Sequence, residues 1–207
     1  MIVNDIVTRV AKELIDTHMV RWQREDLITY LADGVSAIAA KRPALFSHRV
    51  VSLMVDHSPV RLPDDAFLLL SVDSVDGAAV QYVLMDKLNQ INPYWRQEKG
   101  IPSCWTRHDN EVLNFWLYPN PIDPVSLSFQ YAKTPVITVD TERVELPTLF
   151  FGALVDFMLY RAFSRDSENP SEAAKAQFHF QSFALFMNDD QALKGEKDQR
   201  LLQSTVN

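Results

Sequence analysis

Residues 146–166 read LPTLFFGALVDFMLYRAFSRD and contain the longest apolar stretch of the chain. Pro147 is a favourable first-turn residue of a helix, because its missing N–H would have no intrahelical partner there. The apolar residues after it recur with the 3.6-residue period of a helix. The pattern therefore predicts a helix that begins at Pro147, with an inner stripe formed by Phe151, Val155, Met158, Leu159 and Ala162.

This stretch is too short and too interrupted to cross a membrane. Residues 149–163 include Asp156 and Arg161, whereas a bilayer span needs about 20 apolar residues. The N-terminal sequence MIVNDIVTRVAKELI lacks the basic segment and the continuous apolar segment of a secretory signal. We therefore expect a soluble protein.

Two helices are predicted before the central part of the chain. An apolar stripe at positions 3, 6, 7, 10 and 14 predicts the first, over residues 3–14. The second covers residues 25–41 and ends before Pro43. Gly34 lies inside it and costs about 1 kcal/mol relative to alanine. The apolar spacing continues across the glycine, so we expect one unbroken helix.

The last helix is predicted from its N-terminal cap. Asn169 suits the N-cap position and Pro170 suits the position after it. Its inner stripe is expected to hold Phe180, Phe183, Ala184 and Met187.

Between residues 48 and 131 the apolar period changes from 3.6 to about 2, which indicates strands. Asp76-Gly77 is a typical pair for a tight turn, so residues 67–75 and 79–84 are expected to form an antiparallel hairpin. Residues 125–131 alternate cleanly, which predicts a strand with one apolar face. The other expected strands cover residues 50–55, 59–62, 105–107 and 112–118.

These elements predict an α+β fold, in which a four-helix bundle is formed by the N- and C-terminal helices and a small antiparallel β domain is inserted between them. The helices at each end are too few to form separate cores, so they are expected to pack on one another. The expected divisions are residues 1–46 and 146–188 for the bundle, 47–145 for the β region and 189–207 for a polar C-terminal tail.

The composition and net charge of the chain exclude several classes of protein. With 207 residues, of which 47% are hydrophobic, the chain can bury roughly 70% of its unfolded surface. Its formal net charge of −7 is unfavourable for wrapping nucleic acid, because neutralising phosphates requires clustered Lys and Arg. Cys104 is the single cysteine, which excludes an internal disulfide.

Few residues of the chain suggest a catalytic, cofactor-binding or metal site. The five glycines form no phosphate-binding loop. Cys104 and His108 would face the same side of a strand but would lie roughly 13 Å apart, too far for one metal ion. We therefore predict no catalytic residue, no cofactor and no metal site. Carboxylate pairs such as Asp64-Asp65 leave a glycoside-hydrolysing site open.

Two groups of residues are candidates for contacts with partners. Asp156 and Arg161 interrupt an otherwise apolar helix, so they must find polar partners, face outward or contact a neighbouring subunit. Trp95, Trp116 and Tyr118 belong to a cluster of aromatic residues in the β region. Such rings can anchor an interface or stack on sugars, or they can simply fill the core of a small sheet.

Several segments resemble one family of proteins. Leu146-Pro147 together with residues 153–166 (ALVDFMLYRAFSRD) is similar to a segment of the head-to-tail adaptors, or tail tubular A proteins, of short-tailed phages. Residues 20–22 (VRW), 92–95 (NPYW) and 115–121 (FWLYPNP) resemble further pieces of this family. The resemblance covers nearly the whole chain, to about residue 187.

The resemblance implies a structural protein of the virion, located in the tail connector and without enzymatic activity. Such adaptors form a homo-oligomeric ring, typically of twelve subunits, between the portal protein and the tail nozzle protein. DNA passes through the lumen without specific binding. Assembly takes place in the host cytoplasm, and no membrane is involved.

The resemblance also suggests which residues make contacts. On this interpretation, Asp156, Arg161 and Arg165 make inter-helix or inter-subunit contacts. Binding to the portal would use the C-terminal segment, and within it Leu193, Lys194, Arg200, Leu201 and Leu202.

Two other functions remain as alternatives. A tail-associated peptidoglycan hydrolase would use a carboxylate pair such as Asp64 and Asp65 as acid and base. A carbohydrate- or host-binding module would instead use the aromatic residues of the β region, Trp116 among them.

Overall fold

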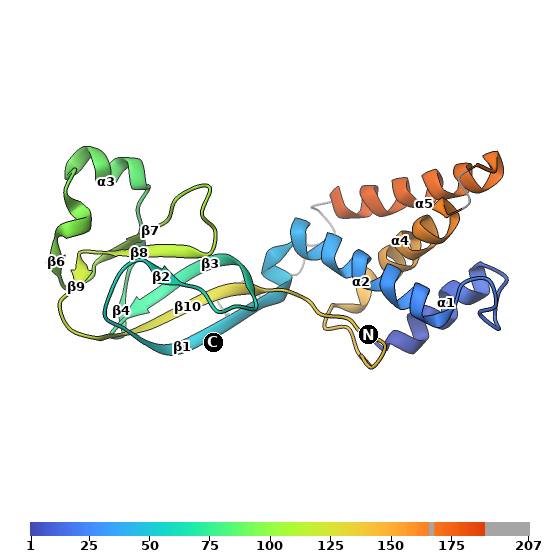
Figure 1. The fold of residues 1–207 in the computed structure, drawn as a ribbon, viewed down its shortest axis with the longest axis horizontal. Coiled ribbons are helices and arrows are strands. Elements are labelled where there is room, and N and C mark those ends of the chain that lie inside the picture. Colours follow the sequence, from blue (N-terminus) through green and yellow to red (C-terminus); the bar gives the residue numbers. More distant parts are fainter. Residues whose placement is uncertain (166–167, 189–207) are drawn as a thin grey trace, which may run out of the picture. The chain divides into compact units, whose positions relative to one another are not determined.

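The structure of the chain, a computed structural model, describes residues 1–165 and 168–188. The chain divides into two compact units. The helical unit comprises residues 1–41 and the described residues between 135 and 188, and the β unit comprises residues 42–134 (Figure 1). The helical unit therefore joins segments that are far apart in the sequence, while the β unit is one continuous segment.

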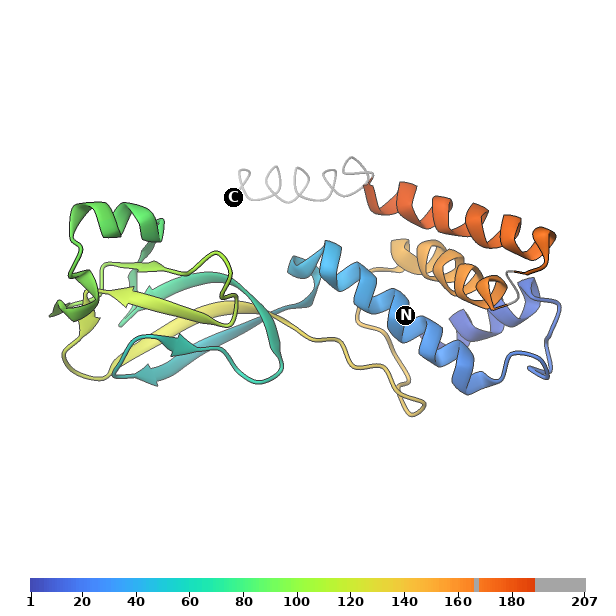
Figure 2. The same cartoon turned by 45° about the horizontal axis from the view of Figure 1, so that its top comes forward.

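Helix α4, Phe151–Ser164, occupies the centre of the helical unit. It packs against α1 (Val3–Glu13), α2 (Arg24–Lys41) and α5 (Pro170–Asn188). In both ribbon views α5 lies on one side of α4, and α1 and α2 lie on the other (Figure 1, Figure 2). Because helices cover it from both sides, most of α4 is buried: Ala153, Leu154, Val155, Phe157, Met158, Leu159, Ala162 and Phe163.

Helix α2 runs unbroken through Gly34, as expected, and the packing explains the glycine. A Cβ atom at this position would lie 3.0 Å from Cδ1 of Phe157 and 3.3 Å from Cδ2 of Leu154, both on α4. These separations are shorter than an optimal carbon–carbon contact, so an added methyl group would push α4 away. The glycine therefore allows α4 to approach α2 closely.

The C-terminal helices begin near their predicted caps. Pro147 precedes a 3-10 turn, Thr148–Phe150, from which α4 continues. Oδ1 of Asn169 accepts the N–H of Ser171 at 3.0 Å and caps α5. The inner stripe of α5 needs one correction: Phe180 is 45% exposed, and the buried residues of this helix are Ala176, Phe183 and Met187.

The β unit contains two larger sheets that share one apolar core. One sheet has strand order β1-β10-β3-β4 and the other has order β2-β8-β7-β5. The first is built from Ser47–Val55 (β1), Ala66–Val75 (β3), Ala78–Ala79 (β4) and Val125–Lys133 (β10). The second is built from Val60–Arg61 (β2), Gln81–Tyr82 (β5), Cys104–Thr106 (β7) and Asn114–Tyr118 (β8).

Strand β10 lies between β1 and β3 and is antiparallel to both. The alternating face predicted for it points into the core, where Val125, Leu127, Phe129 and Tyr131 are all buried. Phe115 and Leu117 of β8 meet this face from the other sheet.

Smaller elements complete the β unit. Helix α3, Met85–Ile91, and a 3-10 turn, Trp95–Gln97, lead to β6, Lys99–Gly100. Strand β6 pairs in parallel with β9, Asn120–Pro121. Strands of two residues carry no alternation, so no hydrophobic pattern predicts this pair.

The hairpin around Asp76-Gly77 is shorter than predicted. The turn itself is present, with φ of 49° at Asp76 and 80° at Gly77. Strand β4 pairs with β3 over only two residues, and the chain then crosses to the second sheet, where β5 pairs in parallel with β7. The antiparallel return over residues 79–84 was therefore wrong. Val80 is buried in the shared core where the chain crosses.

The unit boundaries at 41/42 and 134/135 differ from the expected 46/47 and 145/146. On one side, a 3-10 turn at Pro43–Phe46 packs on β10 and so belongs to the β unit. On the other side, the Val3 N–H donates to the Glu142 carbonyl at 2.9 Å, and the Val144 N–H donates to the Met1 carbonyl at 2.8 Å. These bonds attach residues 142–144 to the helical unit.

Two glycine substitutions test the close approach of α4 to α2. Gly152→Ala places a methyl group with nothing within 4 Å, so helix propensity should raise the free energy of unfolding by up to about 1 kcal/mol. Gly34→Ala gains the same propensity but displaces Phe157, and overpacking of this kind costs about 1–3 kcal/mol. Urea unfolding should find Gly34→Ala the less stable variant. Equal stabilisation by both would mean that the contact with α4 is loose.

Candidate functional site

Arg161 and Arg165 join α4 to α2. Nη2 of Arg161 lies 3.1 Å from Oδ2 of Asp33, and Nη1 of Arg165 lies 3.2 Å from Oδ2 of Asp26. The guanidinium of Arg161 also lies over the ring of Tyr30, 5.6 Å from its centroid. Residues at positions i and i+4 share one face of a helix, so the two arginines together form a polar seam along α2.

Asp156 faces α5 instead. Its Oδ1 lies 2.8 Å from Nδ1 of His179. The imidazole stacks on Phe163, with ring centroids 5.8 Å apart and 17° between the ring planes. A carboxyl group in an apolar helix thus has a polar partner at hydrogen-bond distance, which offsets the cost of its partial burial.

These polar contacts connect helices of the same chain. The arginine–aspartate pairs are roughly half exposed, and exposed pairs contribute at most about 1 kcal/mol each. Their main effect is to fix the rotation of α4 between its neighbours. The sequence analysis did not predict Asp26, Asp33 and His179 as the partners of these side chains. The seven-residue spacing of the two aspartates was the available signal, but spacing along one helix does not identify the helix opposite.

The loop between α1 and α2 is organised by Asp16. Its carboxylate accepts the backbone N–H groups of Val20, Arg21 and Trp22 at 2.9–3.0 Å. These hydrogen bonds, first among them that of Trp22, hold the pKa of Asp16 below its ordinary value. The loop in turn positions the buried indole of Trp22, which donates to the Ala162 carbonyl at 3.3 Å. Asp16 therefore helps to attach the loop to α4.

The aromatic candidates of the β unit divide between core and surface. Trp95 is 1% exposed, and its indole donates to Oδ1 of Asn89 at 2.9 Å. The expectation that Trp95 anchors an interface is therefore corrected, because its ring fills a small core within the β unit. Trp116 and Tyr118 are partly buried against the same cluster, and the Tyr118 hydroxyl donates to Glu98 at 2.9 Å. Only parts of these two rings reach the surface.

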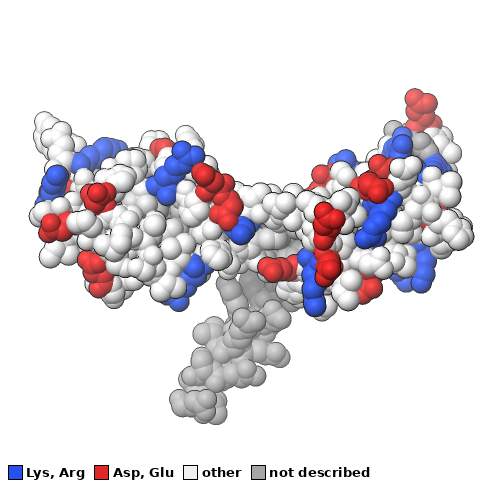
Figure 3. Space-filling model, turned by 60° about the horizontal axis from the view of Figure 1, so that its bottom comes forward, with Lys and Arg blue, Asp and Glu red and all other residues white. Residues whose placement is uncertain are grey.

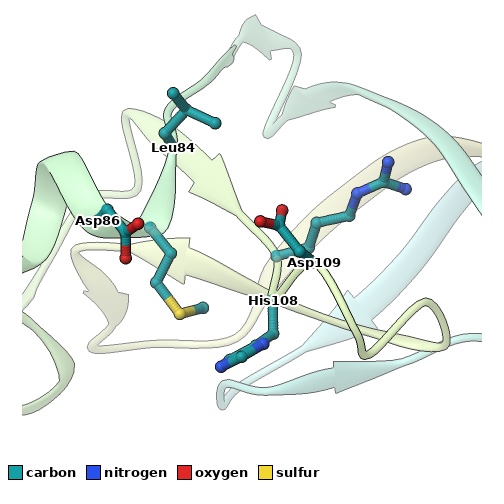
Figure 4. Close-up of a pocket in the computed structure, with 6 residues that line it drawn as sticks. Leu84, Asp86, His108 and Asp109 are labelled. Atoms are coloured by element: carbon teal, nitrogen blue, oxygen red, sulfur yellow. The ribbon is translucent and has the colours of Figure 1, made fainter.

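A hollow of about 90 Å³ lies beside α3 and is lined by Leu84, Met85, Asp86, Arg107, His108 and Asp109. The side chains do not converge on a common point: His108 and the Asp109 carboxylate project in different directions (Figure 4). Arg107 donates to the Leu69 carbonyl at 2.9 Å. The lining therefore does not assemble an acid, a base and a nucleophile around a shared position.

Two observations bear on a possible metal site and on the reactivity of the cysteine. Within residues 1–165 and 168–188, no group of His, Cys, Asp or Glu side chains is placed to hold a metal ion. Cys104 is buried, and desolvation raises the pKa of its thiol. A raised pKa lowers the fraction of thiolate, which is the reactive form.

The carboxylate pair Asp64-Asp65 does not have the environment of an acid–base pair. Asp65 lies 3.1 Å from Nζ of Lys133 and accepts the Tyr131 hydroxyl at 2.9 Å. Lys133 and then Tyr131 hold the pKa of Asp65 below its ordinary value, whereas a general acid needs a raised pKa. The side chain of Asp64 is 97% exposed, with Arg61 3.7 Å away. Asp65 is thus engaged in a structural contact.

Charge on the surface is mixed. On the face shown in Figure 3, acidic and basic side chains are interspersed over both units. A protein that grips DNA presents a contiguous basic surface, and this face does not have one.

Comparison with known families identifies the class of protein. The model of a family described as SU10 adaptor protein matches residues 1–206. The chain belongs to this family. Its members are phage head-to-tail adaptors, so this adaptor is a structural protein of a bacteriophage and a component of the virion. Membership implies contacts with portal and tail components.

No curated protein matches the adaptor in sequence. The likeness to head-to-tail adaptors is confirmed by the family match, while the finer likeness to tail tubular A proteins rests on the sequence resemblance alone. Over the described part of the adaptor, no helix is long and apolar enough to cross a membrane. The predicted portal-binding residues of the adaptor lie outside the described residues: Leu193, Lys194, Arg200, Leu201 and Leu202.

A pH series tests the role of Asp16. The carboxylate form accepts the N–H groups of the loop, so its pKa in the folded adaptor lies below the ordinary 3.8. Its stabilisation is complete above the ordinary pKa and is lost as pH falls through the folded pKa. Asp16→Ala should therefore lower the urea midpoint at pH 7, and the difference from wild type should shrink as the pH is lowered below 3.8. The control Asp64→Ala, which removes a carboxylate whose side chain is 97% exposed, should leave the urea midpoint unchanged at every pH. A loss of stability in Asp16→Ala that does not depend on pH would contradict the assignment.

Proposed function

We propose that the adaptor forms a closed ring, of twelve copies, that joins the portal protein to the tail nozzle protein of a phage. The observation that carries the proposal is the family match over residues 1–206. In this proposal the ring is part of the virion connector and is assembled in the host cytoplasm. The adaptor catalyses no reaction and takes no cofactor.

In the proposed ring, the helices of the helical unit act as one four-helix bundle that forms the wall. The packing of α4 supports this role, because helices from both sides of the β unit in the sequence hold it. The β unit has a core of its own and is left to contact neighbouring virion proteins, with Trp116 and Tyr118 as partly exposed aromatic residues. The net charge of −7 suits a lumen through which DNA slides without specific binding.

The proposed portal contact is made by the C-terminal segment. Residues 189–207 follow directly on α5, and the segment combines Leu201 and Leu202 with Lys194 and Arg200. The segment also carries acidic residues, and apolar side chains flanked by charges of both signs can bind a groove whose edges have complementary charges. Truncation of this segment is therefore the most direct test of the proposed portal contact.

Native mass spectrometry of the adaptor mixed with the portal protein of the same phage tests the proposal. We expect a closed complex with one adaptor per portal subunit. An adaptor truncated after Asn188 keeps all the described helices and should bind the portal at least about tenfold more weakly, the equivalent of about 1.4 kcal/mol. An adaptor that stays monomeric and does not bind the portal would contradict the proposal.

A further inference from the structure

Helix α5 has two apolar faces, and the helical unit covers only one of them. Ala176, Phe183 and Met187 are buried on the side of α4. Phe178 and Leu185 are 64% and 72% exposed. At about 100° per residue, these two side chains lie roughly 200° and 180° around the helix from Ala176, so they form one outward stripe.

This outward stripe carries no charge along α5, a helix that is described throughout. The ionisable side chains of α5 lie on the inner side or its flanks: Glu172 and Lys175 pair at 3.1 Å, and His179 bonds to Asp156. The stripe itself consists of Ser171, Ala174, Phe178, Gln181 and Leu185. In a chain with 23% charged residues, about four helical turns without charge and with two large apolar side chains have the composition of an interface centre.

Helix α2 carries a stripe that complements the one on α5. Thr29, Ser36 and Ala40 are exposed, and Ala32 beside them is half-buried. All four side chains are small, which lets another helix approach closely. Thr29 and Ser36 are seven residues apart on α2, and Phe178 and Leu185 have the same spacing on α5. The side chains of Phe178 and Leu185 can therefore fit beside the small residues along α2. Helices α2 and α5 pack on α4 from different sides (Figure 2).

We propose that Phe178 and Leu185 of one copy pack on the small-residue stripe of α2 in a second copy, and that this is the lateral contact of the ring. The inference rests on the proposed function. A contact between two different faces of the same chain is head-to-tail, the kind of contact that a ring needs, whereas a contact between two α5 helices would stop at a dimer. The occupant of the α5 stripe is therefore α2 of the neighbouring copy.

Cysteine cross-linking of the portal-bound adaptor tests this contact. A chain with both Leu185→Cys and Ser36→Cys should give a ladder of covalent multimers after mild oxidation, because each copy is joined to two neighbours. Each single substitution should give no ladder. Cys104 is buried, and the wild-type chain controls for it. A chain with Ser36→Cys and Ile122→Cys, the latter at a 65% exposed residue of the β unit, is the matched control and should remain uncross-linked.

The outcomes separate this inference from the proposed function. A covalent dimer from Leu185→Cys alone would place α5 against α5, and a cross-link from this residue to the portal would make the portal its occupant. Either result overturns the inference. The absence of a ladder, when the wild-type adaptor forms the ring on the portal, overturns the inference alone. A wild-type adaptor that forms no ring overturns the proposed function.

A second variant needs no cross-link. Phe178→Gln combined with Leu185→Gln should raise the adaptor concentration needed for half-maximal ring formation by at least about tenfold, because the apolar area is no longer buried. Thermal unfolding of the monomer should be unchanged, since both side chains are already exposed. The control, Ile91→Gln with Ile122→Gln, changes side chains that are 69% and 65% exposed in the β unit. Equal effects of the two variants on ring formation would overturn the inference.

Discussion

Burial of α4 is the constraint on which the rest of the helical unit depends. The helix is apolar around most of its circumference, so one neighbour cannot cover it. Helices α1 and α2 come from the start of the chain and α5 from its later part, and all three pack on α4. The unit can therefore form only when the two ends of the sequence meet, which leaves the β unit as a continuous segment between them.

The polar residues of α4 contact the helices that bury it. Arg161 and Arg165 meet α2, and Asp156 meets α5, so the helix is held at one rotation between its neighbours. Gly34 sets the distance on the side of α2. A unit fixed in this way presents its outer faces in constant positions, and the proposed ring requires this because each contact between copies must repeat around it.

Periodicity and capping predicted the helices well, because each of these signals is local. The cap at Asn169 and the unbroken course of α2 are examples. Pairing between distant segments was harder to predict. The crossing of the chain after β4 depends on Val80 entering the shared core, and the partners of Arg161 and Arg165 depend on which helix lies opposite. The sequence left open whether Trp95 lies in a core or at an interface for a similar reason, since the small cluster around it combines Met85 of α3 with Cys104 of β7, and no sequence pattern shows that these elements meet.

Hydrogen–deuterium exchange of the free and portal-bound adaptor tests most directly whether one central helix organises a unit whose outer faces are completed by further copies. The slowest amides of the free helical unit should lie in α4, since it is covered on both sides. Binding to the portal should then slow exchange in α5 and α2 while leaving α4 as it was. Fast exchange of α4 in the free adaptor, or α5 and α2 unchanged in the complex, would contradict this description.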